Sequence, residues 1–156
     1  MAHFIKLHPR ITAGVWFLMF GLLPPSLWFL PSIVKRHDLQ SLFLFVLLPA
    51  MTAFVAGATW GFRILDLHLG RTQLLAFLHG IIVAIIAFLI WVPSFAALFP
   101  LIETEGKVTN IIAFAVGVFY VGLLATGWAL GLLGGLGGWI LYVITRKVAL
   151  EEAGTK

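Results

Sequence analysis

The stretch TQLLAFLHGIIVAIIAFLIWV, residues 72–92, decides the fold class of this chain. It contains no Asp, Glu, Lys or Arg, and its only ionisable side chain is that of His79. A membrane-spanning helix needs about 20 predominantly apolar residues to cross a hydrocarbon core about 30 Å thick. Residues 72–92 therefore predict a transmembrane helix.

The whole chain has the composition of a protein that lies almost entirely within a bilayer. Of its 156 residues, 62% are hydrophobic and 10% are charged, whereas a soluble domain carries about 25% charged residues. Further apolar stretches predict spans at residues 11–31, 42–62 and 120–142. We therefore expect an all-α integral membrane protein, a four-transmembrane-helix bundle that forms a single domain over residues 1–156.

The last apolar region, residues 108–145, is too long for one straight crossing. As a helix it would reach about 55 Å, against a hydrocarbon core of about 30 Å. Tyr120 and Trp139 are separated by about 28 Å of helix, which matches aromatic belts at the two membrane interfaces. This spacing favours a span at 120–142, and residues 108–119 are then either an interfacial segment or part of a long, tilted fourth helix.

The basic residues predict the orientation of the bundle. If the N-terminus is cytoplasmic, seven Lys and Arg residues fall on the cytoplasmic side and three on the other. Cytoplasmic loops carry an excess of Lys and Arg, so we expect both termini in the cytoplasm. These flanking residues explain the net charge of +4, and we expect no nucleic-acid partner. The seven are Lys6, Arg10, Arg63, Arg71, Arg146, Lys147 and Lys156, and the three are Lys35, Arg36 and Lys107.

Small residues recur along one face of two predicted spans. The two stripes are made of Gly127, Gly131, Gly134 and Gly138 in one span and of Ala53, Gly57 and Gly61 in the other. Such stripes let helix backbones approach closely, which favours association in a membrane. The stripes therefore predict tight packing, either on each other within the bundle or against a partner subunit or a second copy. The glycines within residues 134–138 could instead unwind the helix locally.

His79 is the candidate cofactor ligand, because it is the only ionisable residue well inside a predicted span. One ring nitrogen could ligate haem or chlorophyll while a backbone carbonyl orients the other nitrogen. Gly80 beside it would leave room for a flat ring, and Met19 lies at a similar depth as a second candidate haem ligand. The alternatives are a neutral histidine hydrogen-bonded across helices and a proton relay.

Prolines within the predicted spans form a second candidate site. Pro24, Pro25 and Pro49 remove backbone donors and so free carbonyl groups one turn earlier in their helices. One interpretation is a small polar pocket open to the outer side, as a channel or carrier would need. The other is that these are kinked helices whose carbonyls are satisfied by neighbouring groups.

Motifs for catalysis are absent from the sequence, which favours a non-catalytic role. There is no cysteine, Ser–His–Asp arrangement, phosphate-binding glycine loop or His–Glu metal motif. We therefore predict an accessory, structural or assembly subunit of a larger membrane complex or homo-oligomer, with the lipid bilayer and membrane-protein subunits as partners and no metal site. The alternatives are a haem- or chlorophyll-binding electron-transfer or pigment subunit that uses His79, and a small channel or carrier.

Overall fold

The computed structural model of this protein describes residues 8–36, 42–65, 72–102, 111–122 and 127–154. Within these ranges nearly every residue is helical and no β-strand is present, which confirms the predicted all-α class. The α-helices are α2 (Pro9–Arg36), α4 (Leu48–Ala56), α5 (Phe62–Leu65), α6 (Gln73–Ile102), α7 (Ile111–Gly122) and α8 (Trp128–Gly154). Two π-helical segments, η1 (Phe43–Leu47) and η2 (Gly57–Gly61), precede and follow α4.

Three helical stretches of the described residues are long and apolar enough to cross a membrane, which supports a membrane location. They are Phe43–Leu65, Gln73–Phe99 and Ala129–Leu150. The first two overlap the spans predicted at residues 42–62 and 72–92. The apolar part of α2, Pro9–Leu23, is shorter than these three. A crossing at residues 11–31, the four-span topology and the cytoplasmic termini therefore stay predictions.

The last apolar region is described as two helices with residues 123–126 between them outside the described part of the chain. Tyr120 lies in α7 and Trp139 lies in α8. The stretch of α8 that is long and apolar enough to cross a membrane is Ala129–Leu150. The span at residues 120–142 includes residues 123–126, so it stays a prediction.

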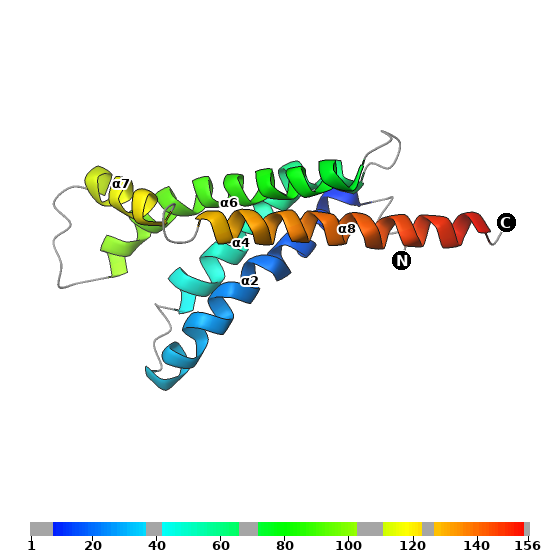
Figure 1. The fold of residues 1–156 in the computed structure, drawn as a ribbon. Helices are drawn as coiled ribbons and strands as arrows, with labels where there is room; N and C mark the ends of the chain where they lie inside the picture. Colours follow the sequence, from blue (N-terminus) through cyan, green and yellow to red (C-terminus); the bar gives the residue numbers. More distant parts are fainter. Residues whose placement is uncertain (1–7, 37–41, 66–71, 103–110, 123–126, 155–156) are drawn as a thin grey trace.

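The helices form two packed pairs that meet at one end of the molecule. α6 and α8 lie side by side and run in opposite directions, while α2 and α4 form a second pair that diverges from α8 (Figure 1). The start of α2 and the end of α8 lie toward the same end (Figure 1). α7 packs on α6 near the opposite end.

Two buried clusters correspond to the two ends of this arrangement. The larger joins α2, α4, α5, α6 and α8, and consists of Ala13, Phe17, Ala56, Ile64, Leu65, Ala76, Val83, Leu141 and Tyr142. The smaller joins η1, α4 and α6 through Leu44, Leu48 and Phe95, with Val118 of α7 packed against it. Lipid is as apolar as these side chains, so close packing rather than exclusion from water stabilises such contacts.

Candidate functional site

The glycines in the middle of α8 bring its backbone into contact with that of α6. A Cβ atom added to Gly134 would lie 2.6 Å from the carbonyl oxygen of Gly80, and one added to Gly138 would lie 2.5 Å from the carbonyl oxygen of Ala76. A Cβ atom at Gly80 would overlap the carbonyl oxygen of Gly134. These three positions therefore have no room for any side chain larger than that of glycine.

Gly80 has a role that the sequence interpretation missed. It was interpreted as leaving room for a flat cofactor beside His79, whereas in the structure its open face is filled by α8. The signal was present in the sequence, because Ala76, Gly80 and Ala84 recur every four residues and so form a small-residue row on one face of α6. α8 also stays α-helical through residues 134–138, so the alternative of local unwinding is wrong.

The stripe of α4 and η2 packs on α2 rather than on α8. A Cβ atom at Gly57 would lie 2.8 Å from the carbonyl oxygen of Ala13, and one at Gly61 would lie 3.0 Å from the ring of Phe17. Ala53 approaches Gly21 of α2 in the same way, because a Cβ atom at Gly21 would lie 2.7 Å from the methyl group of Ala53. The two predicted stripes thus face different helices and do not form each other's contact surface.

Gly131 of the predicted stripe makes no contact of this kind. A Cβ atom at Gly131 would meet no atom within 4 Å, and the same holds at Gly117 of α7. Gly131 borders an apolar hollow of about 80 Å³ between α6, α7 and the start of α8. The residues that line it are Ala84, Ile85, Phe88, Leu89, Phe119, Gly127, Leu130 and Gly131.

His79 has a defined ring orientation and tautomer. Its Nδ1 lies 2.8 Å from the carbonyl oxygen of Leu75, one turn earlier in α6. Because a carbonyl only accepts, Nδ1 carries the hydrogen and donates, and Nε2 of the neutral ring bears a lone pair. The ring stacks on the indole of Trp60, with centroids 6.5 Å apart. The hydrogen bond is thus made within α6, not across helices, and Nε2 is left as the nitrogen that can ligate.

Met19 is not brought to His79. It follows the buried Phe17 by two residues, which places it on the opposite face of α2. Its side chain is 58% exposed. The structure therefore gives no support for a His–Met pair of haem ligands. Among the described residues, no three His, Asp or Glu side chains come together as metal ligands do.

The proline positions do not form a polar pocket in the described part of the chain. α2 continues as a helix through Pro24 and Pro25, whose side chains lie outside the description. Pro49 lies in the first turn of α4, where its missing N–H is tolerated, and the turn before it widens so that the Leu48 amide donates to the carbonyl of Phe43. The apolar hollow beside Gly131 is lined by other residues.

Comparison with known proteins assigns this chain to no family. No protein-family model matches it, and no curated protein or solved structure matches it. Its function is therefore inferred from the packing and geometry of its own residues.

Proposed function

We propose that this chain is a non-catalytic subunit of a larger membrane assembly, and that α7 and the first turns of α8 form its contact surface. The observation that carries the proposal is the open space at Gly117 and Gly131. Glycine in a helix interior costs about 1 kcal/mol relative to alanine, and inside this bundle the cost is offset by close backbone contact. At Gly117 and Gly131 the described part of the chain supplies no such contact, whereas a helix of another subunit would.

The exposure of α7 also supports a contact with another chain. α7 packs on α6 through Phe119, whose ring lies 5.6 Å from that of Phe88. Ile112 and Val121 of the same helix are 77% and 67% exposed. A helix held on one side is expected to gain further contacts from a neighbour.

The test is the mass of the tagged protein extracted from its own membrane in mild detergent. We expect a particle much larger than a detergent-bound monomer, and mass spectrometry of that particle then identifies a partner or a homo-oligomer. Gly131→Leu is expected to release the monomer without lowering its melting temperature. Leu78→Ala, at an exposed position on α6, is the control and should leave the particle intact. A monomeric wild-type particle would contradict the proposal.

A second candidate function, binding of a metal tetrapyrrole such as haem or chlorophyll, is favoured by the geometry of His79. A ligating histidine ordinarily donates its other ring N–H to a carbonyl or carboxylate, and Nδ1 of His79 makes that bond to Leu75. The check is the visible absorbance of protein taken from its native membrane, for wild type and His79→Ala. If wild type shows no visible absorbance band, or if the band persists in His79→Ala, His79 is rejected as the ligand. A channel or carrier gains no comparable support from the described residues.

A further inference from the structure

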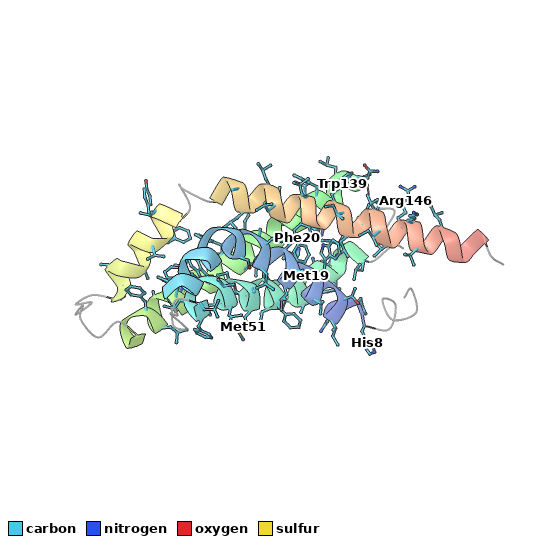
Figure 2. All side chains as sticks on the ribbon, turned by 90° about the horizontal axis from the view of Figure 1, so that it is seen from below. His8, Met19, Phe20, Met51, Trp139 and Arg146 are labelled. Carbon is cyan, nitrogen blue, oxygen red and sulfur yellow. The ribbon has the colours of Figure 1, made fainter. Side chains whose placement is uncertain are left out.

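Four exposed basic side chains lie at one end of the bundle, here named the cationic end. They are Arg10 in α2, Arg63 in α5, and Arg146 and Lys147 in α8. The guanidinium of Arg10 lies 5.1 Å from the ring centroid of Phe62, the residue before Arg63. Tyr142, one turn before Arg146, shares the larger buried cluster with Ile64 of α5. Figure 2 shows Arg146 toward the same end as His8, which precedes α2.

The three arginines contact aromatic side chains. Arg10 lies over Phe62, and the guanidinium of Arg63 lies 3.9 Å from the ring centroid of Trp60. Nη1 of Arg146 donates to the hydroxyl of Tyr142 at 3.5 Å. Aromatic rings stabilise a cation but carry no net negative charge, so the positive charge at this end is not neutralised by these neighbours.

Rows of exposed apolar side chains run toward the cationic end. On α2 the row is Ile11, Val15, Met19 and Leu23, and it begins beside Arg10. On α8 it is Leu136, Trp139 and Val143, which leads to Arg146 and Lys147. Residues spaced by three or four share one helix face, so these two rows are continuous along their helices. On α4 the exposed apolar side chains are Met51 and Val55, and Arg63 follows beyond the π-helical segment η2.

We propose that the cationic end binds the headgroups of anionic phospholipids, with their acyl chains along these rows. The planar guanidinium groups match phosphate oxygens and form charge-assisted hydrogen bonds with them. A soluble phosphate ion would bind the cationic side chains but would make no use of the apolar rows. An acidic protein segment would likewise bind the cations without contacting those rows. A phospholipid matches both features at once. This proposal is independent of the assembly proposed above, because it uses the opposite end of the bundle from α7.

The test uses the full chain in detergent with equal amounts of phosphatidylglycerol and phosphatidylcholine that carry the same acyl chains. Native mass spectrometry then measures the ratio of the two lipids retained on the protein. We expect phosphatidylglycerol to be enriched at least about fivefold, the effect of one basic residue near an anionic surface. The combined variant R10Q/R63Q/R146Q/K147Q is expected to retain both lipids equally, and higher salt should lower the wild-type enrichment.

Three controls make the result decisive. Lys107→Gln removes one charge elsewhere in the sequence and should leave the enrichment unchanged. R10K/R63K keeps the charge but loses the planar donors, so it should reduce the enrichment only in part, and it replaces the combined variant if that variant fails to fold. Millimolar inorganic phosphate should not displace the lipid, and displacement would assign the site to free phosphate. Equal enrichment in wild type and a folded combined variant would overturn the proposal.

Discussion

At the scale of single residues, Gly80 is the position where the backbones of α6 and α8 leave least room. A methyl group there would overlap the carbonyl of Gly134, so Gly80→Ala is expected to push the two helices apart. Overpacking of this kind typically costs about 1–3 kcal/mol. Gly131→Ala is the matched control, because its methyl group would meet no atom within 4 Å and should leave stability unchanged or higher. Thermal unfolding in detergent compares the two, and equal melting temperatures would contradict the close contact at Gly80.

Trp16 makes a directional contact between the first and last described helices. Its Nε1 donates to the carbonyl oxygen of Gly137 at 2.9 Å. Trp16→Phe removes the donor and keeps an aromatic ring, so we expect a loss of about 1 kcal/mol in the free energy of unfolding. Trp139→Phe removes an exposed and longer hydrogen bond, from Nε1 to Oε1 of Gln73 at 3.4 Å. We therefore expect a smaller loss in the free energy of unfolding for this variant. Denaturant unfolding of both variants checks this order, and a larger loss for Trp139→Phe would reject it.

At the scale of helices, hydropathy predicts where apolar segments lie but not where each helix ends. The span predicted at residues 42–62 lies close to the stretch Phe43–Leu65, because Asp38 and Arg63 bound a single apolar run. The span predicted at residues 72–92 begins with α6, but α6 continues to Ile102. No charged residue follows until Glu103, so hydropathy gives no signal for the end of this helix.

The same limit applies to the small-residue stripes. Their spacing shows which residues share a helix face, but it carries no information on which helix will cover that face. The spacing thus marks Gly134 and Gly80 as positions of close packing, but that they pack on each other follows only from the structure. The hydrogen bond from His79 to Leu75 likewise depends on a side-chain rotamer that periodicity does not reveal.

α7 is the helix whose stability should depend most on its surroundings. It packs mainly on α6, and Ile112, Val116 and Val121 are exposed. We expect its amides to exchange with deuterium faster than those of Ala129–Leu150 in the detergent-bound monomer, because helices with few buried contacts open more often. In the assembled particle the amides of α7 should become protected. Equal exchange of α7 in the two preparations would show that it does not contact a partner.

At the scale of the whole molecule, the bundle places the start of α2 and the end of α8 at the same end. His8→Cys and Gly154→Cys should therefore be labelled by a membrane-impermeant thiol reagent from the same side, which the positive-inside rule predicts to be the cytoplasm. The natural chain contains no cysteine, so each variant carries a single thiol. The unaltered chain is the control for background labelling. Labelling from opposite sides would reject the four-span topology.

The bond from Trp16 to Gly137 also has a consequence for the time course of synthesis. Its two residues are separated by 121 positions in the chain. At a translation rate of about 5–20 residues per second, the carbonyl emerges roughly 6–24 s after the indole that binds it. During that interval α2 has been synthesised, but the indole N–H of Trp16 and the face of α2 that contacts α8 have not yet met their partners in α8. The nascent protein therefore passes through a stage in which α2 packs on the helices made soon after it, while the insertion machinery or lipid covers the face that later receives α8. The bundle can close only after Gly137 has been made.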